Sequence, residues 1–205
     1  MRDINGSLDA LARCEHDQGP GPQKLSEDLD RYEKIIEESR PELIIETGTR
    51  NGESARWFSL IGNCRVITID VNPVEVAELR PAMVLAITGD SVSPRVIGRV
   101  TELARGLRTM VSLDSDHSAA HVAQEIGLYA PLVTPGCYLV IEDGIFHYAD
   151  HELRSAHMPE MVGDPLIAIM GSVLPHSRRW QRNRLVEDMH EVTHHPAGWW
   201  LRVER

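Results

Sequence analysis

Hydrophobic side chains recur at helical spacing in residues 26–40, where Leu29, Tyr32 and Ile35 share one face, and the proline at 41 ends this predicted helix. Short apolar runs then alternate with amphipathic stretches as far as Ile141. The predicted strands are 43–46, 65–69, 83–88, 109–113 and 137–141, and the predicted helices between them are 52–61, 73–79, 93–104 and 118–130. This alternation indicates an α/β fold, with a doubly wound, mostly parallel sheet covered by helices on both faces.

The two ends of the chain depart from this pattern. Residues 1–24 are polar and contain GPGP at 19–22, which predicts an N-terminal arm or loop. Residues 145–185 are rich in His, Met and Arg, include a helix-like stretch at 166–173, and form an insertion long enough to act as a lid. Residues 191–203 are predicted to form a final antiparallel strand pair that turns at 195–198, with one of Trp199 and Trp200 facing the core and the other facing outward. No internal repeat is visible, so we expect a single domain over residues 1–205.

Composition narrows the class of protein. The 205 residues carry a formal net charge of −10, which disfavours a general nucleic-acid binder because such proteins usually present a basic surface. Hydrophobic residues make up 42% of the chain, and no apolar run is long enough to cross a bilayer. The first residues do not resemble a signal peptide, and the three widely spaced cysteines form neither a CxxC motif nor a zinc-binding spacing. We therefore expect a cytoplasmic globular protein with reduced thiols.

Ligands of such sheets bind at the carboxyl ends of the strands, so the residues that follow each strand are the candidate site. The first strand leads into a GxxxG turn rather than the GxGxxG of nicotinamide-binding folds, with an acidic residue two positions before the first glycine. That carboxylate would repel a pyrophosphate and attract a cationic amino-acid group. The candidate residues of this loop are Glu46, Gly48, Thr49, Asn51, Gly52 and Ser54.

The second and third strands also end in polar residues. Asp70 ends the second strand, where an acidic side chain commonly accepts hydrogen bonds from ribose hydroxyls. Gly89, Asp90 and Ser91 follow the third strand and border the same crevice. Together with the glycine turn, these residues form a candidate cofactor site.

Carboxylates gather at the ends of the fourth and fifth strands. Asp114 and Asp116 follow the fourth strand, and Glu142 and Asp143 follow the fifth. Because these strands are expected to be neighbours, so many negative charges in one crevice are unfavourable unless a proton or a metal ion compensates them. Oxygen ligands suit a hard cation, with Mg²⁺ first and Ca²⁺ or Mn²⁺ as substitutes. The alternative is that one acid contacts a ligand and the others face water.

The order of these motifs on alternating strands resembles the class I S-adenosylmethionine (SAM) methyltransferases over residues 42–143. The resemblance implies that the loop 46–52 holds the methionine part of SAM. It also implies that Asp70 holds the ribose and that Asp90 with Ser91 lies on the adenine side.

A longer stretch carries a more specific resemblance. The sequence LDSDHSAAHVAQEIGLYAPLVTPGCYLVIEDG is similar to the cephalosporin hydroxylase/rhamnosyl O-methyltransferase family and, more distantly, to metal-dependent catechol-type O-methyltransferases. In those enzymes an Asp after the fourth strand and an acidic pair or an acid–amide pair after the fifth bind Mg²⁺. The resemblance therefore implies that Asp114, Glu142 and Asp143 bind the metal, with Asp114 also bordering the SAM site.

The resemblance also suggests the acceptor and the group that takes its proton. Three residues after Asp114, where catechol-type enzymes place a lysine, this chain has His117, as metal-dependent macrolide-sugar O-methyltransferases do. Histidine accepts protons near neutral pH, so we expect His117 to act as the general base toward a sugar hydroxyl, with His147 as the second candidate. The tail HHPAGWWLR is most similar to that of mycobacterial sugar O-methyltransferases of methylmannose polysaccharide synthesis.

The sequence thus predicts a SAM- and Mg²⁺-dependent O-methyltransferase that acts on a sugar or oligosaccharide. The arm and the insertion are both available to form a homodimer, and no nucleic-acid or membrane partner is expected. Three alternatives stay open at this point. They are a metal-assisted hydrolase or hydroxylase that uses the same acids without SAM, a small-molecule or catechol-like O-methyltransferase, and a protein that uses the fold for binding alone.

Overall fold

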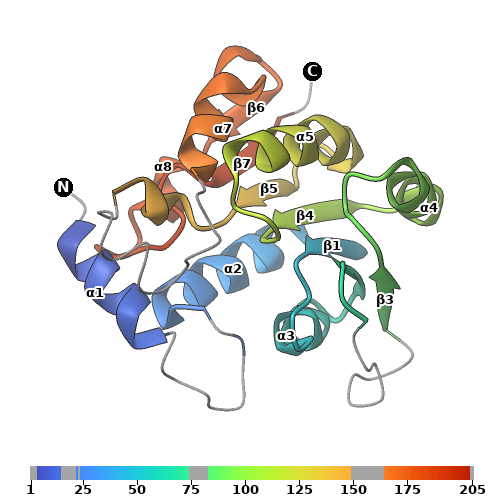
Figure 1. Cartoon of the computed structure of the whole chain (residues 1–205), viewed down its shortest axis with the longest axis horizontal. Coiled ribbons are helices and arrows are strands. Elements are labelled where there is room, and N and C mark those ends of the chain that lie inside the picture. Colours follow the sequence, from blue (N-terminus) through green and yellow to red (C-terminus); the bar gives the residue numbers. More distant parts are fainter. Residues whose placement is uncertain (1–3, 15–21, 23, 74–82, 149–163, 204–205) are drawn as a thin grey trace.

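One mixed sheet organises the protein, of which the computed structural model describes residues 4–14, 22, 24–73, 83–148 and 164–203 (Figure 1). Its strands are β1 (Leu43–Thr47), β2 (Arg65–Asp70), β3 (Val84–Thr88), β4 (Thr109–Leu113), β5 (Tyr138–Ile141), β6 (Trp180–Arg182) and β7 (Trp199–Arg202). They follow the order β3-β2-β1-β4-β5-β7-β6. The first five pair in parallel, whereas β7 is antiparallel to both of its neighbours. The predicted α/β fold, with a mostly parallel sheet and antiparallel C-terminal strands, is therefore confirmed.

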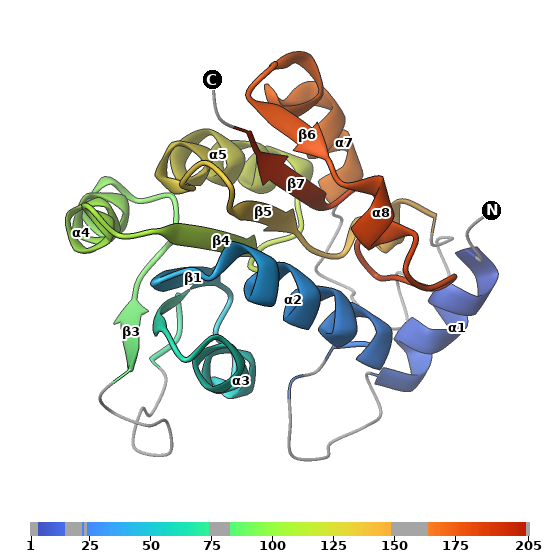
Figure 2. The ribbon, with the colours of Figure 1, turned by 180° about the vertical axis from the view of Figure 1, so that it is seen from behind.

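Helices cover both faces of this sheet. Helices α2 (Ser26–Ser39) and α3 (Glu53–Gly62) lie on one face, and α4 (Pro94–Ala104) and α5 (Ala119–Tyr129) lie on the other (Figures 1 and 2). The other elements are α1 (Ile4–Cys14), α7 (Pro165–Gly171), α8 (Arg184–Glu187) and the 3-10 helices η2 (Ala130–Leu132), η3 (Gly144–Tyr148) and η4 (Leu174–His176). Across the residues described, no helix combines the length and the apolar character needed to cross a membrane.

The central strands lie in the core because both of their faces are covered. Every residue of β1, β4 and β5 is buried, including the few polar residues within these largely apolar strands. On the face that α2 covers, the ring of Tyr32 packs edge-on against Phe58, with centroids 4.9 Å apart, and against Trp199, with centroids 5.1 Å apart. These three aromatic rings tie α2, α3 and β7 together.

The N-terminal segment differs from the sequence prediction. Residues 4–14, predicted as part of an arm or loop, form the helix α1. Ile4 and Leu8 are one helical turn apart and pack against Ile145 and Phe146 of η3. This small apolar contact gives the helix a partner that its polar sequence does not reveal.

The C-terminal strands also differ from the prediction. The prediction of a strand pair within residues 191–203 is wrong, because β7 pairs with β5 and with β6. Strand β6 lies inside the segment 145–185, which was predicted to be a lid. Trp199 and Trp200 are both buried in the main core, so the expectation that one of them faces outward is wrong. Residues 191–198 form a loop instead. The predicted helix 73–79 lies, apart from Pro73, outside the described residues.

Gly48 marks how closely the strand ends approach one another. Its φ of 83° lies in the left-handed region, and a Cβ atom at this position would stand 1.8 Å from the backbone oxygen of Asp114. Only a residue without a side chain lets the loop after β1 lie against the end of β4. At Gly98, in the middle of α4, such a Cβ would meet no heavy atom within 4 Å apart from its chain neighbours and the backbone of its own helix.

We expect Gly48→Ala to destabilise the protein by about 2–4 kcal/mol, because it adds both backbone strain and a steric clash. Gly98→Ala is the matched control and should stabilise the protein by about 0.5–1 kcal/mol, because alanine favours a helix interior. Urea denaturation followed by circular dichroism measures both free energies of unfolding. A Gly48→Ala protein as stable as the wild type would contradict the close approach of the two strand ends.

Candidate functional site

The carboxyl ends of the parallel strands meet at one edge of the sheet. Thr47 at the end of β1 is in register with Ile69 of β2 and with Leu113 of β4, and Leu113 is in register with Ile141 of β5. The residues that follow these four positions are therefore brought side by side, as the sequence analysis required.

The turn after β1 encloses a buried acid. Glu46 is fully buried, and its Oε2 accepts a hydrogen bond from the hydroxyl of Thr68 (2.6 Å). Its Oε1 has no hydrogen-bond partner in the part of the chain that the structure describes. Burial raises the pKa of Glu46 to about 7, although the charge of Lys24 opposes the shift. An orphaned carboxylate oxygen in a strand-end loop suits a ligand that donates hydrogen bonds, such as an ammonium group.

The other predicted residues of this turn shape the loop. The hydroxyl of Thr49 lies 2.6 Å from that of Thr68 and is buried. Asn51 lies on the exposed side and bonds Glu53, Gly52 has a φ of 81° at the start of α3, and Ser54 is partly buried in the first turn of that helix.

Asp70, the last residue of β2, lies beside the loop that follows β1. Its two carboxylate oxygens accept hydrogen bonds from the backbone N–H groups of Arg50 and Asn72, each at 2.8 Å. The side chain therefore links the loop after β1 to the end of β2. It is partly exposed, and each oxygen retains a lone pair for a further donor.

The residues after β3 divide into an exposed and a buried group. Asp90 is exposed and accepts a hydrogen bond from the backbone of Val92, and Gly89 adopts a φ of 150° before it. Ser91 is buried, and its hydroxyl donates to Glu125 of α5 (2.6 Å). Glu125 is itself fully buried, with Oε2 lacking a hydrogen-bond partner among the described residues.

Three predicted side chains form a compact cluster at the ends of β4 and β5. Ligand atoms of Asp114, His117 and Asp143 all lie within 4.8 Å of one another. The Nε2 atom of His117 is 3.4 Å from Oδ1 of Asp114 and 3.0 Å from Oδ2 of Asp143. The spacing of two carboxylates and an imidazole is that of a group able to hold one metal ion.

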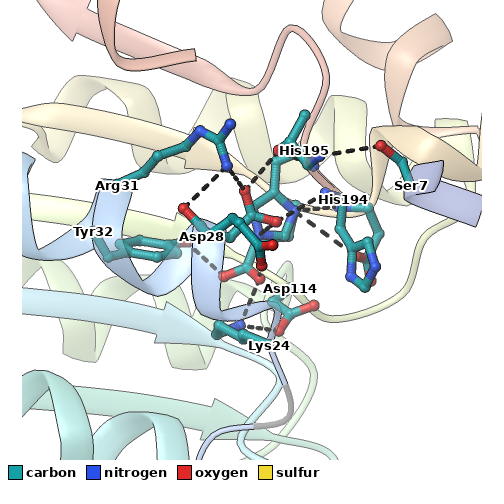
Figure 3. A network of polar contacts seen from close by, with 12 residues as sticks. Ser7, Lys24, Asp28, Arg31, Tyr32, Asp114, His194 and His195 are labelled. Carbon is teal, nitrogen blue, oxygen red and sulfur yellow. Dashed lines mark hydrogen bonds and ion pairs between the residues drawn. The ribbon is translucent and has the colours of Figure 1, made fainter. Parts of the chain in front are cut away.

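Glu142, the third predicted metal ligand, is not a member of this compact group, and it is linked to Asp114 through a lysine that the sequence analysis did not single out. The ammonium group of Lys24 lies 2.7 Å from Oδ2 of Asp114 and 2.5 Å from Oε2 of Glu142 (Figure 3). The other oxygen of Glu142 accepts hydrogen bonds from Tyr32 and Ser112, both at 2.6 Å. The three predicted metal ligands therefore belong to one network of contacts, in which Glu142 is the most buried of the three.

The charges of this network set its protonation states. Burial alone lowers the pKa of His117, but the charge of Asp143 and the hydrogen bond to Asp114 outweigh it and raise the pKa to about 10. Burial raises the pKa of Asp114, but the charge of Lys24 outweighs it, so the pKa lies below its usual range. Burial and the charge of Asp114 raise the pKa of Glu142. In this arrangement the ammonium and the imidazolium are the cations that balance the acids.

The loop 193–198 also contacts the Glu142–Asp143 pair. Asp143 has a φ of 56°, and its backbone N–H donates to Nδ1 of His195 (3.0 Å). A ring nitrogen that accepts a hydrogen bond carries no proton, which assigns the proton of the neutral ring to Nε2, 3.3 Å from Oε2 of Glu142. His195 thus holds the backbone of one acid and faces the carboxylate of the other.

A buried ion pair anchors this loop to α2. Oδ1 of Asp28 accepts from Arg31 (2.9 Å) and from the hydroxyl of Thr193 (2.6 Å), while Oδ2 accepts from the backbone N–H of His194 (2.8 Å) (Figure 3). Arg31 also donates to backbone oxygens of Val186, Glu187 and His190. Both charged side chains are fully buried. Segments at opposite ends of the chain are joined in this way behind the acid pair.

Two predicted candidates lie apart from the cluster. His147 is largely exposed and pairs with Asp164 at the start of α7, with its Nδ1 2.7 Å from Oδ2 of the acid. Asp116, the less favoured alternative to Asp114, is exposed and accepts a hydrogen bond from the backbone N–H of Ser118, the N-cap residue of α5 (2.7 Å).

Sequence reasoning missed Lys24, Asp28 and His195. Lys24 lies in the polar segment predicted as an arm, where its only signal is that the chain contains just two lysines. Asp28 falls within a predicted helix, and His195 within a predicted turn. Neither position has a spacing relative to the acids that a sequence pattern could detect.

Comparison with known proteins places the chain in a family. Residues 21–203 match the family described as Rhamnosyl O-methyltransferase/CmcI, and the chain belongs to this family. The rhamnosyl O-methyltransferase of Mycobacterium tuberculosis (strain ATCC 25618 / H37Rv) is 34% identical over 129 residues, which are 58% of this chain and 53% of that protein. That of Mycobacterium leprae (strain TN) is 34% identical over 128 residues, 58% of this chain and 56% of the relative. The chain spans about half the length of these curated relatives.

Solved structures share the fold at lower sequence identity. CmcI with Mg and SAM is 20% identical with a TM-score of 0.63, covering 89% of this chain and 74% of that chain. The apo structure of a TDP-rhamnose 3'-O-methyltransferase of calicheamicin biosynthesis is 14% identical with a TM-score of 0.56, covering 97% of this chain and 93% of that one. A methyltransferase of mycinamycin biosynthesis with Mg, SAH and mycinamycin VI is 19% identical with a TM-score of 0.51, covering 77% and 40%.

Removing the Asp28 carboxylate tests the buried Asp28–Arg31 ion pair that joins α2 to the C-terminal loop. We expect Asp28→Ala to lower the free energy of unfolding by about 3–5 kcal/mol, because it removes the carboxylate that pairs with the buried charge of Arg31. Asp30→Ala on the same helix removes an exposed acid that pairs with His190 and should cost less than about 1 kcal/mol. Chemical denaturation of both variants measures the difference, and equal, small losses would contradict a buried ion pair at Asp28.

Proposed function

We propose that this protein is a SAM- and Mg²⁺-dependent O-methyltransferase that transfers a methyl group to a hydroxyl of a sugar or oligosaccharide. The observation that carries the proposal is the cluster of Asp114, His117 and Asp143 at the carboxyl ends of β4 and β5. It lies at the edge of the sheet where such folds bind their ligands. Membership of the Rhamnosyl O-methyltransferase/CmcI family supports the same chemistry.

The strand ends offer suitable partners for each part of SAM. The unpartnered carboxylate oxygen of Glu46 would accept from the ammonium group of the methionine part, beside the backbone of Gly48. Asp70 has a free lone pair on each oxygen for ribose hydroxyls. Asp90, and Ser91 with Glu125, would border the adenine side.

The acids after β4 and β5 fit a hard divalent cation. Asp114 and Asp143 would hold the ion with the carboxylate of Glu142, and all three donors are oxygens, as Mg²⁺ prefers. When bound, Mg²⁺ supplies Lewis-acid polarisation of an acceptor hydroxyl and SAM supplies the electrophilic methyl group. Mg is named in the CmcI and mycinamycin-pathway structures that share this fold.

His117 is the residue that would take the proton from the acceptor hydroxyl. It lies beside both Asp114 and Asp143, and its ring packs against Phe146 with centroids 5.4 Å apart, which fixes its orientation. The negative charges of the same two acids raise the pKa of His117 and keep its ring protonated in the present arrangement. A divalent cation that balanced these charges would lower the pKa of His117 and let the ring accept a proton.

The acceptor is a saccharide in this proposal because the curated relatives are named rhamnosyl O-methyltransferases. A precursor of methylmannose polysaccharide, suggested by the C-terminal sequence, is the more specific acceptor to test. Residues 145–185 would act as a lid over the site. The protein would form a homodimer through the N-terminal segment and this insertion. We propose a single domain over residues 1–205, in the cytoplasm.

Calorimetry with SAM, in Mg²⁺ and in EDTA, together with turnover on labelled SAM and a panel of sugars, tests the proposed function. We expect SAM to bind in both conditions and methyl transfer to require the metal. Asp143→Asn should weaken Mg²⁺ binding more than about 10-fold with SAM affinity unchanged, whereas Asp116→Asn at the neighbouring exposed acid should change neither. Metal binding without SAM affinity would instead favour the hydrolase or hydroxylase alternative, and SAM binding without turnover a binding protein.

His117→Ala should reduce the turnover number by about 10²–10⁴-fold while leaving the affinity for SAM unchanged, because it removes the proposed general base. His147→Ala serves as the comparison and should have a small effect, since His147 is exposed and pairs with Asp164. Steady-state methyl-transfer assays measure both variants. Full turnover in His117→Ala would transfer the role to His147 or to solvent.

A further inference from the structure

Lys24 lies in the middle of the acidic cluster although it comes from a segment with no predicted structure. Its ammonium group contacts Asp114 at 2.7 Å and Glu142 at 2.5 Å, and the lysine side chain is only 4% exposed (Figure 3). A buried lysine that bridges two acids from different strands occupies a place between carboxylate oxygens that a hard cation would also take.

The remaining contacts of the two acids single out these oxygens. Oε1 of Glu142 is already held by Tyr32 and Ser112, so that Oε2, which also lies 3.3 Å from Nε2 of His195, is the oxygen left for a cation. Oδ1 of Asp114 faces His117, which leaves Oδ2. Lys24 binds both of these remaining oxygens, Oε2 and Oδ2.

Electrostatic repulsion prevents the Lys24 ammonium group and a divalent metal ion from binding these two oxygens at the same time. An ammonium group and a divalent ion bound to the same two oxygens would stand within a few ångströms of each other in a site withdrawn from water. There their repulsion is far larger than in solvent. Without either of them, the two buried acids would repel one another, and His117 beside Asp114 would be left to balance the group. The site therefore needs one cation at these oxygens and cannot hold two.

We propose that Lys24 is a resident cation of the acidic cluster, and that a divalent metal ion binds by displacing its ammonium group from Asp114 and Glu142. The inference rests on the proposed function, because it assigns a role to Lys24 at the same metal site. The lysine keeps the acids together while the metal is absent, and its release accompanies metal binding.

Amine labelling of the wild-type protein tests the displacement directly. The protein is treated with an amine-acylating reagent in EDTA and in saturating Mg²⁺ or Mn²⁺, and mass spectrometry measures the modification of each lysine. We expect Lys24 to be protected in EDTA and to react at least about 10-fold faster with the metal, because the bridging contacts that bury it are lost. Lys34, the other lysine of the chain, is exposed beside Glu38 and provides the internal control. Protection of Lys24 that persists in the metal-bound protein would overturn the proposal.

A variant series separates this inference from the proposed function. In calorimetry with Mg²⁺ alone, Lys24→Met should bind the ion about 10-fold more tightly than the wild type or better, because the competing charge is gone. Lys34→Met, which removes the same charge at an exposed position, should not. In EDTA, Lys24→Met should melt at a lower temperature than the wild type, and Mg²⁺ should restore it.

The outcomes are distinct. Tighter binding by Lys24→Met than by the wild type and Lys34→Met supports the displacement. Binding by Lys24→Met alone would show that the metal does not displace Lys24 in the natural protein, and would overturn both the displacement and the metal-dependent function. Equal binding by the wild type, Lys24→Met and Lys34→Met overturns the competition and leaves the metal-dependent function intact. A failure of all three proteins to bind Mg²⁺ overturns both.

Discussion

Compensation of buried negative charge is the constraint on which the site depends. Asp114, Glu142 and Asp143 end neighbouring strands and are largely withdrawn from water, which costs several kcal/mol per ion unless opposite charge lies beside them. Lys24 and His117 provide that charge within the described chain. Apolar residues of similar size at these positions would satisfy the fold as well or better. We therefore interpret the concentration of acids as a functional arrangement.

The acids are held by segments from both ends of the sequence. Arg31 and Asp28 on α2 bind the backbone and side chains of the C-terminal loop, and that loop places His195 against the backbone of Asp143. The segment before α2 supplies Lys24. Because these contacts form only when the whole domain is folded, the geometry of the site is coupled to the packing of α2 on the sheet. Such support is what keeps ligands of a metal or a cofactor in position.

The central part of the fold could be predicted from the sequence, and the supporting contacts could not. Between residues 43 and 141, apolar runs bounded by Pro and Gly predicted the strands and helices to within a residue or two, apart from 73–79, which the structure does not describe. The strand ends then followed from topology, which brought Asp114 and Asp143 together. The three-residue strand β6 is too short to produce an alternating pattern, so its pairing with β7 was missed. The burial of both Trp199 and Trp200 was missed because the prediction assumed that one face of this strand is exposed. Lys24 reaches the acids through tertiary packing that no local spacing records.

The most direct test of the account is to locate the cation. Crystals grown with Mn²⁺ and S-adenosylhomocysteine, measured at a wavelength where manganese scatters anomalously, would show where the ion binds. We predict one anomalous peak bounded by carboxylate oxygens of Asp114, Glu142 and Asp143. Crystals that contain the cofactor product but no manganese among these acids, from a protein that still transfers methyl groups, would contradict the central claim.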